Sequence, residues 1–358
     1  MISYLEVRGI YTRAPFAIIE PAECWFELAF SGVGQFQVYT RATKTALDAL
    51  KIGNYISIPK RPYIWLIENI SLKFEAGRGY MISATGRQAK IILKKRIINK
   101  QTQLADDLTS AVFELIQKHA GAGAGEVRRI DGLAQLTSAV VRPITETQVS
   151  YANLYEYTEE LLATYGAGAE LLLTDTADFR YNIYEGADRS ETVIFSQTYD
   201  NLTASEYTAS EEALRTFALI GGQGEGAERI LQEYDGAPQF RGIDRAEIFV
   251  DAKDVSAKYT DESGTEQELD LTTEAGLATY KKWLTARGEI TIAENAIVET
   301  FTGEINTQAT RYKFGEDYNL GDRVRVQDDF LGVYITPRIL KFTMRQDRTY
   351  SELVEYGG

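Results

Sequence analysis

The side chains that most often carry out catalytic or metal chemistry are scarce in this chain. It contains one histidine, His119, and one cysteine, Cys24. A Ser-His-Asp triad would have to use that single histidine, and a zinc site would have to work with one histidine and one cysteine. His119 lies near the end of a predicted helix, where a cation is favourable. We therefore expect it to be a solvated helix-end residue.

Carboxylates are abundant, because 52 of the 358 residues are Asp or Glu. A pair of carboxylates acting on a glycosidic bond is compatible with this composition, but no spacing singles out such a pair. One cluster combines Asp244, Arg245, Glu247, Asp251 and Asp254. It has two interpretations, a metal site or a set of ion pairs that fixes a strand against a neighbouring domain or subunit, and we favour the ion pairs.

Two glycine-rich stretches invite comparison with phosphate-binding loops. Residues 121–125 lack the Lys-Ser/Thr pair of a P-loop. Residues 221–226 follow the apolar run 217–220, but no apolar-periodic helix follows them, and Glu225 would face the phosphate. We interpret both as turns or linkers. The sequence thus assigns no catalytic, cofactor-binding or metal-binding residue and predicts no cofactor.

The composition bounds the class of protein. With 44% hydrophobic and 25% charged residues, the chain has material for two or three folded domains. Its net charge of −14 disfavours a grip on nucleic acid but is compatible with solubility alone, or with an acidic wall that DNA passes without adhering. A single cysteine excludes an intrachain disulfide. Neither a signal peptide nor a membrane-spanning run is recognisable, so we expect a soluble protein made in a cytoplasm.

The elements that would position any site are mainly strands. Alternating apolar residues bounded by glycine and proline turns are typical of an antiparallel barrel or sandwich. Such strands are predicted at 24–30, 35–39, 54–58, 64–74 and 80–84. Later strands are predicted at 169–174, 179–184, 192–196, 216–220, 228–234, 246–250, 290–300 and 307–312, and within 320–356.

Three helices interrupt the β pattern. Apolar residues at helical spacing predict them at 103–118, 151–165 and about 273–287. Ser150 is the expected N-cap of the second helix, and Thr272 or Thr273 that of the third. Gly166 and Gly288 are the expected stops.

The same hairpin pattern occurs near each end of the chain. When the sequence is shifted by 268 positions, Gly53 falls on Gly321 and six apolar positions match in type without a gap. The matching positions are Ile56 and Val324, Ile58 and Val326, Trp65 and Val333, Ile67 and Ile335, Leu72 and Leu340, and Phe74 and Phe342. The repeat predicts two β units of shared shape in one chain. Three such chains would present six similar units around an axis.

That arrangement resembles the baseplate or tail-tip hub proteins of tailed phages, of the siphophage type. The resemblance is carried by the repeat and by four stretches, 179–196, 222–229, 242–254 and 320–326. It extends over nearly the whole chain. It implies a mainly β fold with α+β insertions, in which two similar tube-type β-barrel domains carry smaller decorating α/β domains. The chain resembles the N-terminal hub part of tail-associated lysin and tail fibre proteins. It ends at Gly358, so we do not expect a lysin activity.

The resemblance also divides the chain into domains. The first tube-type barrel would comprise 1–103 with 171–222, and the second would comprise 311–358. An α/β insertion domain would occupy 104–170, and an α+β peripheral domain 223–310.

The implied function is structural rather than enzymatic. A homotrimer with a pseudo-six-fold ring would adapt the hexameric tail tube to the tip and line the channel for DNA and the tape-measure protein. Its partners would be a distal tail protein or tail tube ring, the tape-measure C-terminus, and fibre or spike proteins. DNA would pass without specific binding, and the chain would not insert into a membrane. It would be located at the virion tail tip, after assembly in the bacterial host cytoplasm.

Two alternatives stay open at this point. One is a carboxylate-dependent cell-wall or glycan hydrolase of the tail tip, which requires a cleft with two facing carboxylates. The other is a carbohydrate-binding β module, which requires an exposed groove of aromatic side chains.

Overall fold

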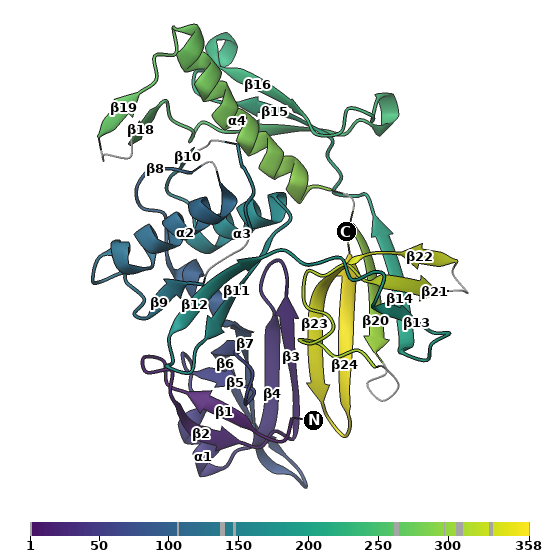
Figure 1. Cartoon of the computed structure of the whole chain (residues 1–358). Coiled ribbons are helices and arrows are strands. Elements are labelled where there is room, and N and C mark those ends of the chain that lie inside the picture. Colours follow the sequence, from purple (N-terminus) through teal and green to yellow (C-terminus); the bar gives the residue numbers. More distant parts are fainter. Residues whose placement is uncertain are drawn as a thin grey trace.

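The computed structural model describes residues 2–105, 107–136, 140–145, 148–260, 265–296, 298–305, 311–328 and 332–357. Within these ranges, buried apolar side chains form three hydrophobic cores. Figure 1 shows a large sheet at the bottom, a helical region above it, and a small sheet crossed by one long helix at the top. The described helices include none with the length and apolar character needed to cross a membrane.

The N-terminal strands form one half of the large sheet. Their alternation is that of a half-buried sheet: in β3 the buried Cys24, Phe26 and Leu28 alternate with the partly exposed Trp25 and Glu27. The elements are β1 (Leu5–Arg8), β2 (Pro15–Ile19), β3 (Glu23–Ala29), β4 (Gln35–Arg41), α1 (Lys44–Ala49), β5 (Tyr55–Ser57), β6 (Ile64–Glu75) and β7 (Gly79–Gln88).

The C-terminal strands complete that sheet. They are β14 (Leu202–Ser210), β20 (Val298–Ile305), β23 (Arg338–Gln346) and β24 (Tyr350–Gly357). Strand β23 pairs with β3, which gives the order β14-β20-β24-β23-β3-β4-β7-β6-β5-β1-β2 among the described residues. The mainly β prediction is therefore confirmed. The end strands β14 and β2 are not paired with each other in this part of the chain, so one chain forms an open sheet and no closed barrel.

The first core lies against this sheet and also receives a small neighbouring sheet. That sheet consists of β13 (Ile194–Ser196), β21 (Arg325–Asp328) and β22 (Val333–Ile335). Segment 171–222 is divided among the three cores: Val193, Phe195 and Leu202 join the first core, Phe179 and Ile183 join the second, and Ala218 and Ile220 join the third.

The second core is built around two helices that follow the N-terminal strands. The elements are η1 (Ala89–Lys95), β8 (Thr102–Gln103), α2 (Leu108–His119), η2 (Ala122–Ala124), β9 (Leu133–Gln135), β10 (Gln148–Val149), α3 (Leu154–Thr164), β11 (Gly168–Leu173) and β12 (Phe179–Tyr184). Helix α3 is capped by Asn153, whose side chain accepts from the amides of Tyr155 and Glu156, so the prediction of Ser150 was wrong. Gly166 ends the helical turn with φ +69°, as predicted.

The third core lies between a small sheet and the long helix. The elements are β15 (Phe217–Gly221), η3 (Gly226–Glu228), β16 (Leu231–Asp235), η4 (Gly242–Asp244), β17 (Glu247–Asp251), β18 (Lys258–Thr260), β19 (Glu266–Glu268) and α4 (Glu274–Glu294). Thr273 caps α4 by accepting from the amide of Gly276. Strands β16, β15 and β17 lie side by side, and α4 packs against them.

The prediction that Gly288 stops this helix was wrong. Gly288 is buried inside α4, where a Cβ would lie 2.8 Å from Ile220 Cδ1 and 3.0 Å from Tyr234 Cβ. Glycine here lets the helix approach the sheet closely instead of ending it. The strand predicted at 290–300 consequently begins only at Val298, and the strand predicted at 307–312 lies largely outside the described residues.

The two copies of the repeat share their start and their final hairpin. Gly53 and Gly321 both have positive φ, +93° and +83°, and each precedes a short strand. The long strand β6 corresponds to β22 and β23 in the second copy, and β6–β7 and β23–β24 are both antiparallel hairpins. The copies differ in the burial of one aromatic side chain: Phe342 is fully buried, whereas its counterpart Phe74 is 63% exposed.

Candidate assembly site and motif junction

Two of the stretches singled out in the sequence meet in space. The turn after β12 packs against the segment that starts the second repeat copy, and a Cβ on Gly186 would lie only 1.7 Å from the Gly321 carbonyl oxygen. The backbone amide of Arg189 donates to the Arg323 carbonyl (2.7 Å), and the amide of Arg323 donates to the Ala187 carbonyl (2.9 Å). These contacts lead into the parallel pairing of β13 with β21. We call this region the motif junction.

Asp322 connects the two sides of the motif junction. Its side chain is 6% exposed, and Oδ1 accepts from the amide of Ala187 (2.7 Å) while Oδ2 accepts from the amide of Asn319 (2.9 Å). Asp188 shapes its own turn, because its Oδ1 accepts from the amide of Ser190 (2.9 Å). Hydrogen bonds from the side chain and the backbone amide of Ser190 lower the pKa of the Asp188 carboxyl. The polar residues of both stretches thus hold backbone in place.

We expect Gly186→Ala to destabilise the protein by about 1–3 kcal/mol, because the new methyl group would overlap the Gly321 backbone and force the two segments apart. Urea unfolding measures this change. Gly9→Ala is the matched control, since the nearest atom to its new Cβ is the Thr12 hydroxyl at 3.0 Å, which can move. An equal loss in both variants would contradict the close backbone contact.

The acidic cluster around β17 forms ion pairs, as favoured from the sequence. Arg245 pairs with Glu247 (2.6 Å) and Asp235 (3.3 Å), and its guanidinium lies 3.8 Å from the centre of the Phe217 ring. Asp251 pairs with Arg229, and Asp254 pairs with Arg287 (2.6 Å) on α4. In the part of the chain that is described, no three metal-ligating side chains come together.

The glycine-rich stretch 221–226 is a turn. Arg229 donates to the carbonyls of Gly221 (2.6 Å) and Gly222 (3.1 Å), so these carbonyls face a guanidinium. The stretch leads into the short η3 and then into β16, whereas a phosphate-binding loop opens a helix. The other stretch, 121–125, contains η2 and follows the end of α2.

The prediction for His119 was wrong, because the ring is buried rather than solvated. It is 2% exposed, with Nδ1 3.1 Å from Asn99 Oδ1 and Nε2 3.4 Å from Thr102 Oγ1. Burial is the main cause that lowers its pKa to about 4, and the nearby cations, foremost Arg128, lower it further. The neutral imidazole is therefore a polar core residue.

This burial makes the stability of the protein sensitive to mild acid. Because the folded pKa lies below the unfolded value of about 6.5, the neutral ring contributes stability above that pH and loses it as the pH falls towards 4. We expect the unfolding free energy to fall by about 2 kcal/mol more in the wild type than in His119→Gln between pH 7 and pH 5. Urea unfolding of both proteins at the two pH values measures the difference, and equal losses would contradict it.

The large sheet presents one polar face. Opposite the core side, β3, β4, β7 and β23 carry alternating hydroxyl, amide and charged side chains, including Gln35, Gln37, Ser83, Thr85 and Thr343. Several charges on this face are paired, with Lys341 3.0 Å from Glu355 and Arg87 2.7 Å from Glu68.

The polar face contains a pocket of about 590 Å³ with two carboxylates, Glu23 and Asp347. Each carboxylate lies near an arginine, Arg78 for Glu23 (3.7 Å) and Arg345 for Asp347 (3.4 Å). Hydrogen bonding from the Thr349 amide lowers the pKa of Asp347. A glycosidase needs one carboxyl with a raised pKa as its acid, so the properties of Asp347 are opposite to those of that acid.

The outer part of the β6–β7 hairpin extends beyond the hydrophobic core of the large sheet. In β6 the residues Ile64–Ile67 are buried, but most later residues are exposed, and the tip of the β6–β7 hairpin carries Leu72 (53% exposed), Phe74 (63%) and Tyr80 (62%). Strand β5 pairs only with residues 64–66 of β6, so the outer edge of β6 beyond residue 67 has no strand partner among the described residues. Strand β14 is an end strand of the sheet order and has one described neighbour, β20.

Comparison with known proteins agrees with the motifs. The model of the family described as Siphovirus ReqiPepy6 Gp37-like protein matches residues 23–355. The chain belongs to this siphovirus tail protein family. The resemblance stated from the motifs is thereby confirmed at the level of a phage tail protein. No curated protein matches the chain.

Solved structures show that the fold of this family member occurs in other tail proteins. The 43 kDa tail protein of prophage MuSo2 from Shewanella oneidensis is similar with a TM-score of 0.58 and 14% identity, over 99% of this chain and 97% of that one. A tail protein from Neisseria meningitidis MC58 gives 0.57 and 12%, over 99% and 96%. Prophage tail protein gp18 from Listeria monocytogenes EGD-e gives 0.55 and 10%, over 99% and 94%. At these identities the similarity shows a shared fold.

Proposed function

We propose that this tail protein is the structural, non-enzymatic hub of the tail tip. It forms a homotrimer whose pseudo-six-fold ring joins the hexameric tail tube to the tip and surrounds the channel for DNA and the tape-measure protein. Its neighbours are a distal tail protein or tube ring on one side and fibre or spike proteins on the other. The observation that carries this proposal is the strand order of the large sheet.

That order contains two four-strand units, β14-β20-β24-β23 and β3-β4-β7-β6. The repeat makes β23 the counterpart of β6, and both are the last strand of their unit. Within one chain, β23, the last strand of the first of these units, pairs with β3, the first strand of the other, from Lys341 opposite Ala29 to Gln346 opposite Cys24. The same kind of contact between chains would pair β6, the last strand of one unit, with β14, the first strand of the other unit in the next chain.

Both strands needed for that contact are available. The outer edge of β6 beyond residue 67 and the outer edge of β14 lack a described strand partner. Unpaired sheet edges readily accept another strand, and exposed apolar side chains mark contact surfaces. Repeating a head-to-tail contact around a three-fold axis closes a ring of six similar units, and such a ring would complete the tube-type barrels that a single chain leaves open.

In this ring the polar face of the sheet would line the bore, because the opposite face is occupied by the first core. An acidic wall is one of the possibilities that the net charge of −14 leaves open for this face, and two of the acidic side chains on it are paired with cations. Glu355 and Glu68 are neutralised by Lys341 and Arg87, and hydroxyl and amide groups lie between them. DNA would pass such a wall because unpaired cations, which phosphates require, are few on it.

The oligomeric state in solution tests this proposal. We expect native mass spectrometry of the purified chain to give three times the chain mass, and electron-microscopy averages to show a ring with a central bore. A chain that stays monomeric at all concentrations, and also fails to join purified tail tubes, would overturn the hub assignment.

A further inference from the structure

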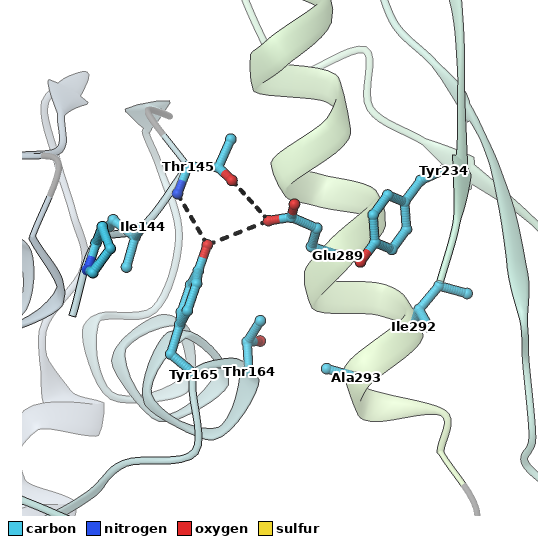
Figure 2. A pocket seen from close by; sticks show the side chains of 9 residues that line it. Ile144, Thr145, Thr164, Tyr165, Tyr234, Glu289, Ile292 and Ala293 are labelled. Atoms are coloured by element: carbon cyan, nitrogen blue, oxygen red, sulfur yellow. Dashed lines mark hydrogen bonds between the residues drawn. The ribbon is translucent and has the colours of Figure 1, made fainter. Parts of the chain in front are cut away.

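A pocket of about 450 Å³ lies between the second and third cores, away from the sheet edges. One wall comes from the end of α3 and the segment before it, and the other from α4 and β16. It is lined by Pro143, Ile144, Thr145, Thr164, Tyr165, Tyr234, Glu289, Ile292 and Ala293. Figure 2 shows the carboxylate of Glu289 extending from α4 towards the opposite wall, with Tyr165 and Tyr234 on either side.

The Glu289 carboxylate is held in place by the opposite wall. Its Oε2 accepts from the Thr145 hydroxyl (3.0 Å) and from the Tyr165 hydroxyl (3.3 Å). The Tyr165 hydroxyl in turn accepts from the amide of Thr145 (3.1 Å). Two of these hydrogen bonds hold one carboxylate oxygen and the third positions the Tyr165 hydroxyl, and the other carboxylate oxygen has no hydrogen bond to the residues drawn in Figure 2.

Among the described residues, Glu289 takes part in no ion pair, whereas neighbouring carboxylates do. Of the two arginines closest to the pocket in sequence, Arg142 pairs with Glu185 (2.8 Å) and also donates to the Tyr165 carbonyl, and Arg287 pairs with Asp254 (2.6 Å). Burial raises the pKa of Tyr234, and the charge of Glu289 raises it further. A fixed carboxylate beside two aromatic rings thus produces a negative potential in a partly apolar pocket.

We propose that this pocket binds a primary ammonium group carried on a short alkyl chain. The free oxygen of Glu289 would accept from the ammonium group, and the two tyrosine rings would stabilise its charge through their faces. Ile144, Ile292 and Pro143 would contact the methylene groups, whose transfer from water is favourable. The same chemistry is offered by a free linear amine and by a lysine side chain of a partner protein. Either ligand would join the α3 and α4 walls and stabilise their contact.

Titration of the full chain with n-butylammonium chloride tests the proposal, with binding followed by two-dimensional NMR and thermal unfolding. We expect saturable binding and a raised midpoint temperature with n-butylammonium, and neither effect with the neutral n-butanol. Glu289→Gln is expected to weaken binding about tenfold or more, as removal of one partly buried ion pair does. Glu274→Gln, at the exposed start of the same helix, is the matched control and should bind as the wild type does.

Two further arms make the outcome decisive. Ala293→Trp fills the pocket while keeping the carboxylate and should abolish binding even if Glu289→Gln folds poorly. Spermidine and Nα-acetyl-lysine amide distinguish a free amine from a lysine side chain by which of them binds more tightly. Equal binding of n-butanol, unchanged affinity in Glu289→Gln, or saturable binding of glucose but not of the amine would each overturn the proposal. None of these outcomes depends on the trimeric state.

Discussion

Replacing Leu72 and Phe74 together by aspartate is expected to convert a trimeric ring into a folded monomer. Both side chains are more than half exposed in one chain, so the substitutions should change monomer stability by no more than about 0.5 kcal/mol each. In the proposed ring they lie on the hairpin that meets the next chain, where two desolvated carboxylates would oppose association strongly. Native mass spectrometry and circular dichroism measure the two properties separately.

Ile243→Asp is the control for this experiment. Ile243 is 99% exposed, but it lies on the η4 loop beside the small sheet of the third core, away from the large sheet. We expect the Ile243 variant to remain trimeric. A trimer that survives in the Leu72 and Phe74 double variant would show that the hairpin tip takes no part in assembly and would remove the support given by the free strand edges.

The second large effect concerns a buried ion pair. Lys90 is 1% exposed, and its Nζ donates to Glu159 Oε2 (3.0 Å) and to the Ala169 carbonyl (2.7 Å). Glu159 also accepts from the amide of Gly32 (2.8 Å), which ties α3 to the β3–β4 turn. We expect Lys90→Met to destabilise the protein by about 3–5 kcal/mol, because it leaves the Glu159 carboxylate buried without its partner. Urea unfolding at neutral pH measures this loss.

The adjacent surface pair provides the control. Lys94 and Glu156 lie on the same two elements, η1 and α3, at 2.7 Å, but both are about half exposed. Lys94→Met should therefore cost less than about 1 kcal/mol. Adding Glu159→Gln to Lys90→Met should recover part of the loss, since the amide oxygen can still accept from Gly32. A double variant as unstable as the sum of the single variants would show that the pair does not act as a pair.

The sequence predicts the elements well where a local pattern decides them. Alternation identifies the strands at 24–30 and 80–84, and the cap at Thr273 and the stop at Gly166 follow from side-chain and backbone preferences. The prediction that Gly288 ends the helix was wrong because the sequence does not distinguish a glycine that ends a helix from a glycine that lets a helix approach a sheet. Only the positions of Ile220 and Tyr234 distinguish the two cases.

The sites that were missed depend on residues distant in the chain. Lys90 reads as a surface charge near Lys94 and Lys95, and only its contacts with Glu159 and Ala169 reveal a buried cation. The position of His119 at the end of a helix suggests a solvated ring. Its burial depends on Asn99 and Thr102, which the fold brings to the ring and which no local pattern indicates. No periodicity relates Thr145 to Glu289, which lie 144 positions apart. Stretches 179–196 and 320–326 stood out in the sequence through the family resemblance, and only the structure shows that they meet at the motif junction.

The pairing of β23 with β3 also has a consequence for how the protein is made. The amide of Ile2 donates to the side chain of Gln346, 344 positions away, beside the strands that join the two halves of the sheet. At roughly 5–20 residues per second, β3 leaves the ribosome on the order of tens of seconds before β23 exists. During that time its edge, with Trp25 and Phe26, is open to any other nascent chain. Completion of the last hairpin therefore protects the first strands from aggregation, and truncation before β23 should yield an insoluble product.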